Sequence, residues 1–166
     1  MRILNKLLIF ILVFVTCASA EIVIEEEEVT TTTTNSITTE ISSCEENNLV
    51  MKSIFEVIKD IVLSSVGEEN IEEKLKLFQN NKEYLTEIGI LVANVSVSDS
   101  EQLVIRNQLE EYRLLAYADA AISYEILSDD DVSLGGPLWE QYSITVNDLF
   151  ALEERLSINL ENYQCD

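Results

Sequence analysis

The stretch from Pro137 to Tyr163, PLWEQYSITVNDLFALEERLSINLENY, has the clearest periodicity in the chain. Every gap between its main apolar positions is three or four residues; these positions are Leu138, Tyr142, Val146, Leu149, Leu152, Leu156, Leu160 and Tyr163. This spacing places all of their side chains on one face of an α-helix. Pro137 suits the first turn of that helix, where its missing amide hydrogen costs nothing. The stretch therefore predicts a long helix with one buried face.

Three further helices are expected upstream, over residues 45–66, 69–92 and about 98–127. Gly67 and the Gly135-Gly136-Pro137 cluster mark breaks, and Ser98 with Glu101 forms a capping-box pattern at the start of the third helix. Asn80-Asn81 is a possible interruption of the second. The residues expected to be buried are Leu49, Ile54, Val57, Ile58 and Ile61, then Ile71, Leu75, Phe78, Leu85, Ile88 and Leu91, then Leu103, Leu109, Tyr112, Ala116, Ile122 and Ile126.

Four helices with short connections predict an all-α fold, an antiparallel up-down-up-down four-helix bundle over residues 44–166. In such a bundle the first helix starts at the end where the fourth helix finishes. Cys44 precedes the first helix and Cys165 follows the fourth, so the topology brings the two cysteines together. We expect them to form an intramolecular disulfide in an oxidising compartment. Free thiols or an intermolecular bond are the alternative.

The N-terminal segment has the features of a signal peptide. Arg2 and Lys6 are followed by an apolar run from Leu7 to Val15, and Ala18-Ser19-Ala20 supplies the small residues of a cleavage site. The uncharged run is shorter than the roughly 20 residues of a membrane span. We therefore expect residues 1–20 to be removed, the protein to be secreted, and no segment to span a membrane.

Residues 21–43 differ in composition from the rest of the chain. They contain four consecutive glutamates and then many threonines and serines. Such a polar stretch buries too little apolar surface to offset the entropy of ordering it. The sequence predicts a flexible, acidic, Thr-rich tail, which O-linked glycans could also modify.

The charge of the chain limits its partners. It has 10 Lys+Arg against 31 Asp+Glu, a formal net charge of −21. Phosphate backbones attract proteins through Lys and Arg, so nucleic-acid binding is excluded. Basic proteins, cationic small molecules and divalent metal ions are the partners that such a surface favours.

Residues that support catalysis are scarce. The chain has no histidine, which removes the usual general base near neutral pH and the Ser-His-Asp and Cys-His arrangements. It also has no Gly-rich phosphate loop, and its paired helical carboxylates fall at outward positions. We expect no enzyme activity and no cofactor.

One loop resembles a calcium site. Counting from Asp129, oxygen-bearing side chains occupy positions 1, 3 and 5 of an EF-hand frame and a glutamate occupies position 12; these candidate ligands are Asp129, Asp131, Ser133 and Glu140. Position 6, which normally requires glycine, is Leu134, and no second loop is present. An acidic turn that complements the dipole of the fourth helix is the competing interpretation.

Asn94-Val95-Ser96 is an N-glycosylation sequon, expected in the link between the second and third helices. Tyr117, Tyr124 and Phe150 lie off the main apolar faces and could mark a partner surface.

The sequence as a whole predicts a secreted, non-enzymatic binding module for an extracellular protein partner, for which a basic protein is one candidate. The alternative is a carrier that holds a small apolar ligand between its helices.

Overall fold

The computed structural model describes the backbone of residues 35–129 and 136–165, and the side chains from Cys44 onward. This part of the chain contains four helices and no strand: α2 (Asn35–Leu63), α3 (Ile71–Asn94), α4 (Ser100–Ser128) and α5 (Pro137–Asn162). The predicted all-α class is confirmed. The predicted signal peptide, residues 1–20, and residues 21–34 of the predicted tail lie outside the described residues.

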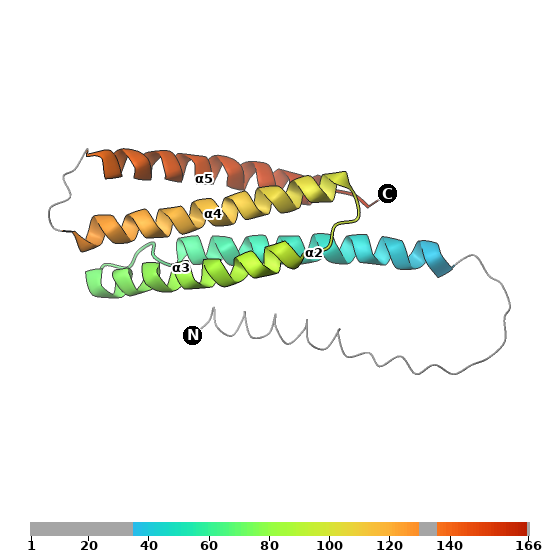
Figure 1. Ribbon diagram of the computed structural model, residues 1–166, viewed down its shortest axis with the longest axis horizontal. Coiled ribbons are helices and arrows are strands. Elements are labelled where there is room, and N and C mark those ends of the chain that lie inside the picture. The colour runs from blue at the N-terminus through green and yellow to red at the C-terminus, as the bar shows by residue number, and fades with distance from the viewer. Residues whose placement is uncertain (1–34, 130–135, 166) are drawn as a thin grey trace, which may run out of the picture. The chain divides into compact units, whose positions relative to one another are not determined.

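Successive helices run in opposite directions (Figure 1). α3 packs on α4, and α4 packs on α5. Side-chain bonds tie α2 to the other three helices, because Asn81 of α3, Gln102 of α4 and Glu153 of α5 each contact a residue of α2. The up-down-up-down bundle is therefore confirmed. The two cysteines lie at one end of it. The ends of α2 and α4 and the starts of α3 and α5 lie at the other, which we call the far end (Figure 1).

Two helix starts differ from the prediction. α2 begins at Asn35, so residues 35–43, which composition assigned to the tail, have helical backbone. No Gly or Pro occurs in this segment, and Ser or Thr costs a helix less than about 1 kcal/mol per residue relative to Ala.

The cap of α4 is Asp99 rather than Ser98. The Asp99 carboxylate accepts from the amide of Gln102 at 2.8 Å, and Gln102 Oε1 accepts from the amide of Ser98, the residue before the cap, at 2.9 Å.

Most predicted core residues are buried or half-buried, and three are exposed. Leu49, Ile71 and Leu103 are exposed, since each lies at the edge of its predicted face or in a first turn. The face of α5 is buried most deeply in its second half, at Leu149, Leu152, Leu156, Leu160 and Tyr163. The core also includes residues that the prediction omitted, among them Met51, Phe55, Val92, Ile105 and Ala120.

Asn81 is the buried polar residue that joins α2 to α3. The Asn80-Asn81 pair does not interrupt α3; instead the Asn81 side chain is 4% exposed and points inward. Its Nδ2 donates to the carbonyl oxygen of Ile61 at 3.1 Å. That carbonyl lies in the last turn of α2, where helix carbonyls lack i+4 partners, and it also accepts from the amide and the hydroxyl of Ser64. Asn81 therefore caps α2 from the neighbouring helix.

Arg113 joins α4 to the middle of α3. Its Nη1 donates to the Leu85 carbonyl at 3.0 Å, and its Nε and Nη2 donate to the Glu110 carboxylate at 2.7 and 2.6 Å. The guanidinium lies directly on α3 at Gly89, where a Cβ would be only 3.1 Å from it. The small residue allows the side chain to reach the backbone of α3.

Candidate functional site

A groove opens at the far end of the bundle, between α2 and α5. Its volume is about 350 Å³. The apolar side chains of its lining come from the end of α2 and the turn that follows it, from α3 and from the first half of α5, and are Val62, Leu63, Val66, Phe78, Val146, Leu149 and Phe150. We call this feature the α2–α5 groove. Its size lies within the range of small-molecule sites.

Large apolar side chains flank the groove and remain in contact with solvent. Leu63 is 56% exposed, Val66 is 73% exposed and Phe150 is 57% exposed. Single exposed apolar residues are common, whereas a group of them around one concave surface is typical of a binding site. Phe150 had been singled out in the sequence as lying off the main apolar face of its helix.

Polar side chains from α3, α4, α5 and the turn after α2 also line the groove. They are Ser65, Lys74, Asp119, Ser123 and Tyr142. The hydroxyl of Tyr142 is hydrogen-bonded to Ser123, so these two side chains fix the contact between α5 and α4. Asp119 is the acid in this lining.

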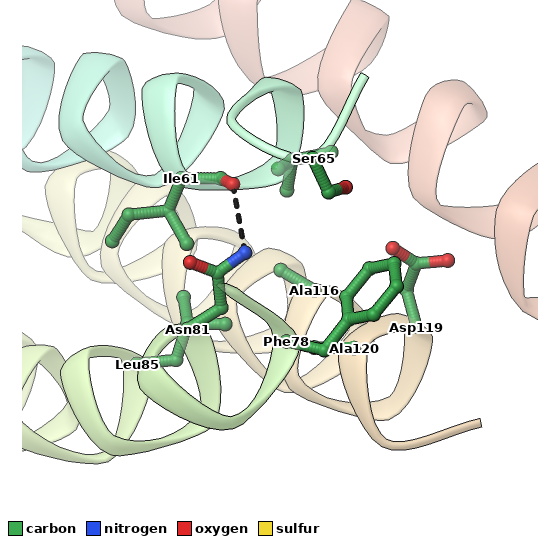
Figure 2. Close-up of a pocket in the computed structure, with 9 residues that line it drawn as sticks. Ile61, Ser65, Phe78, Asn81, Leu85, Ala116, Asp119 and Ala120 are labelled. Atoms are coloured by element: carbon green, nitrogen blue, oxygen red, sulfur yellow. Dashed lines mark hydrogen bonds between the residues drawn. The ribbon is translucent and has the colours of Figure 1, made fainter. Parts of the chain in front are cut away.

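Asp119 lies where the groove meets the packed interior. It lines both the α2–α5 groove and a tight pocket between α2, α3 and α4, whose walls include Phe78, Asn81 and Ala116. That pocket has no room for a water molecule. Figure 2 shows its side chains close together, with the Asp119 carboxylate at their outer edge and directed away from Asn81. Asp119 therefore has protein on one side and the groove on the other.

The environment of Asp119 disfavours its charged form. Its side chain is half-buried, and burial alone raises its pKa from the ordinary value of 3.8 to about 6. Within the described part of the chain, the carboxylate has no hydrogen-bond donor and no ion-pair partner, although Lys74 also lines the groove. Buried polar groups are normally hydrogen-bonded or paired. The Asp119 carboxylate is therefore an unsatisfied acid within the described part of the chain.

A second hollow of about 190 Å³ continues from the groove past Phe78, Ser123 and Tyr142 to Trp139. Trp139 is the only tryptophan of the chain. Its ring packs edge-on against Tyr142, with 5.9 Å between centroids. Its buried Nε1 has no hydrogen-bond partner among the described residues. The wall that α5 contributes to this end of the bundle is thus largely aromatic.

The disulfide end has a different character. The sulfurs of Cys44 and Cys165 lie at bonding distance, and their Cα atoms are 6.0 Å apart, so the predicted proximity of the two cysteines is confirmed. Tyr163 donates a short hydrogen bond to Asp99, and the side-chain amide of Gln102 donates to the Cys44 carbonyl at 2.9 Å. The hydrogen bond from Tyr163 helps to lower the pKa of Asp99. These bonds tie α2, α4 and α5 together.

The predicted glycosylation residue lies slightly earlier than expected. Asn94 is the last residue of α3 rather than a link residue, and its side chain is exposed. Its Nδ2 donates to the Ile90 carbonyl at 2.8 Å. Nδ2 carries two hydrogens, so the second remains available to an enzyme that attaches a glycan.

The predicted calcium ligands are only partly described. Asp129 is the C-terminal cap of α4 and Glu140 lies in the first turn of α5, and both side chains are exposed. Asp131 and Ser133 lie outside the described residues. Within the described part of the chain, no three acids or cysteines are grouped closely enough to hold a metal ion. The calcium interpretation stays a prediction.

The other two aromatic residues singled out in the sequence are not fully exposed. Tyr117 and Tyr124 are half-buried on α4. The ring of Tyr124 is covered by Lys82, whose Nζ lies 5.6 Å from its centroid. Of the three, only Phe150 presents a largely exposed ring.

Asp119 was not predicted from the sequence, although a signal for it exists. Tyr112, Ala116, Asp119 and Ser123 follow one another at gaps of four, three and four residues, so they share one face of α4. Tyr112 and Ala116 were predicted to be buried. An acid in register with them is directed toward the interior, which distinguishes it from the solvated acids of the same helix.

No family model, no curated protein and no solved structure matches this chain. Among the helices of the described residues, none has both the length and the apolar character that a membrane span requires.

Proposed function

We propose that this chain is a secreted, non-enzymatic binding protein whose acidic surface engages a basic extracellular protein. The net charge of −21 carries the proposal, because a field of one sign attracts partners of the opposite sign and accelerates their association. The exposed apolar residues around the α2–α5 groove add a contact that is specific rather than only electrostatic. The signal-peptide features of residues 1–20 and the paired cysteines support secretion, and the exposed Asn94 side chain supports N-glycosylation.

Secretion is tested by expressing residues 1–166 in a eukaryotic secretory host and measuring the intact mass of the product in the medium. We expect a chain that begins at Glu21, that gains two hydrogens on reduction, and that loses mass at Asn94 on enzymatic deglycosylation. A product that stays in the cells and retains residues 1–20 would overturn the secretion proposal.

Partner binding is tested with a panel of purified basic secreted proteins, with polylysine as the charge control. We expect at least one protein of the panel to bind saturably, and Phe150→Ser to weaken that binding without changing the binding of polylysine. Ile158→Ser is the matched control, because Ile158 is 50% exposed on the same helix and does not line the groove. Binding that polylysine reproduces, and that Phe150→Ser leaves unchanged, would reduce the proposal to non-specific charge attraction.

A carrier of a small apolar ligand is the second candidate, and the groove volume favours it. The described groove is open to solvent and lined by side chains of all four helices or the turns next to them, so a ligand would bind at the end of the bundle rather than inside it. Gentle purification followed by native mass spectrometry tests this function. A retained molecule that is released on unfolding supports it, and a ligand-free mass that no added apolar compound changes would remove it.

A further inference from the structure

We propose that the α2–α5 groove binds a small organic cation, an amine whose ammonium group pairs with the Asp119 carboxylate and whose apolar body lies along the groove between Val66 and Phe150. This inference rests on the carrier function proposed above and names the class of ligand. It follows from the position of one acid and from the chemistry of the groove around it.

The carboxylate of Asp119 is partly buried and lacks a hydrogen-bond donor or a cation beside it among the described residues. It is half-buried between a tight pocket and an apolar groove, and no donor or cation of the described residues contacts it. A carboxylate in such surroundings loses hydration without gaining a hydrogen bond. An ammonium group placed in the groove would donate charge-assisted hydrogen bonds, which are among the strongest that a protein forms.

The walls of the groove also favour a cation with an apolar body. Three aromatic residues, Phe78, Tyr142 and Phe150, are among those that line it, and aromatic rings attract cations. The aliphatic residues Val62, Leu63 and Val66 suit an alkyl or aryl group. An organic anion would be repelled by the carboxylate of Asp119 and by the net charge of −21. A bare metal ion would need several oxygen ligands, whereas the acid that this groove supplies is Asp119.

The ionisable groups around Asp119 leave its charge available. Lys74 of α3 and Tyr142 of α5 line the same groove, and the segment of α2 and its following turn contributes Ser65 but no ionisable side chain. Lys74 makes no ion pair with Asp119 within the described residues. Burial sets the pKa of Asp119 at about 6 in the free protein. An ammonium ligand should therefore bind more tightly above this pH than below it.

The test compares octylamine with octan-1-ol, which have the same apolar chain and differ in charge. Isothermal titration calorimetry on the intact secreted protein at pH 7.5 should give an affinity for octylamine about tenfold or more above that for octan-1-ol. At pH 5 only about one carboxylate in eleven is ionised if its pKa is about 6. The affinity for the amine should then fall about tenfold, while that for the alcohol stays constant. The fluorescence of Trp139, beside Tyr142, gives an independent readout of binding.

Asp119→Asn should remove both the preference for the amine and its pH dependence. Asp148→Asn is the matched control, because Asp148 is exposed on α5, does not line the groove, and its replacement changes the net charge equally. Equal affinities of the wild-type protein for amine and alcohol would overturn the cation site and leave an apolar carrier. An equal loss in both variants would show attraction by the net charge alone and would also overturn it. Binding of neither compound would overturn the inference and count against the carrier function, leaving the protein-partner proposal standing.

Discussion

Replacing Asp119 by asparagine should make the protein more stable at neutral pH. The folded chain holds the Asp119 proton up to a pH of about 6, whereas the unfolded chain releases it near the ordinary value of 3.8. Between these values the folded state binds more protons than the unfolded state. The free energy of unfolding therefore falls as the pH rises through this window, and above it the whole loss is present.

The size of this effect follows from the pKa difference. Each pKa unit corresponds to about 1.4 kcal/mol, so a rise from 3.8 to about 6 sets an upper value of about 3 kcal/mol. Part of the side chain remains in contact with water, which screens its charge, so we expect about 1 to 2 kcal/mol. An asparagine side chain is neutral at every pH and has nearly the same shape as aspartate, so the variant avoids this cost.

Urea denaturation followed by circular dichroism at pH 7.5, 5 and 3.5 tests the prediction. The gain of Asp119→Asn over wild type should be largest at pH 7.5 and should vanish at pH 3.5, where Asp119 is neutral in the folded state. Asp148→Asn should show no such pH-dependent gain, because its side chain is exposed. A gain that persists at pH 3.5, or no gain at pH 7.5, would refute the assignment of Asp119 as an unpaired, partly buried carboxylate.

Three further substitutions test how the bundle is held together. Asn81→Ala should cost about 1 to 3 kcal/mol, since it removes the buried hydrogen bonds that join the Asn81 amide to the Ile61 carbonyl and the Ser64 hydroxyl. Asn80→Ala, at an exposed neighbour, should cost under about 1 kcal/mol by the same urea titration. Tyr112→Phe should cost about 1 to 2 kcal/mol through loss of its hydrogen bond at 3.0 Å to a carboxylate of α5, and unchanged urea midpoints would contradict it. Replacing both Cys44 and Cys165 by serine should cost about 4 kcal/mol, because the bond closes a loop with a sequence separation of 121 residues; calorimetry with and without a reducing agent should show that only the wild-type protein responds to reduction.

The helices and their order could be predicted because their signals are local. The apolar residues of α5 from Leu149 to Tyr163 are all spaced three or four positions apart, and Pro137 occupies the first position of that helix. The position of the cysteines then followed from topology alone. The agreement of these two levels made the fold predictable from a single sequence.

Errors arose where two local patterns compete or where a partner from another helix decides the outcome. Leu49 was expected in the core, yet it is 65% exposed, because Met51 and Phe55 take the inward positions of α2. Asn81 was considered a possible helix break, although the last turn of α2, distant in sequence, gives its amide a partner. Local periodicity contains no information on that contact.

The candidate site was harder to predict because it depends on an acid placed where acids are rare. Asp119 stands among alanines on a helix rich in glutamates, and composition does not distinguish it from a solvated charge. Only its register with Tyr112 and Ala116 indicates burial. Register gives the face of a helix, but the open groove above that face results from the spacing of α2 and α5, which no local pattern specifies.

The two ends of the bundle differ in how well their polar groups are satisfied. At one end, the cysteine pair and the bonds of Tyr163 and Gln102 hold three helices together. At the far end, the partly buried carboxylate of Asp119 costs stability at neutral pH in the absence of a ligand. Strain and unsatisfied groups persist only where the surrounding structure fixes them. A bundle whose helices are joined by a disulfide at one end can tolerate an unsatisfied acid at the other. The same acid that weakens the free protein would strengthen a complex with a cation, because the energy lost on folding would be recovered when the ligand binds.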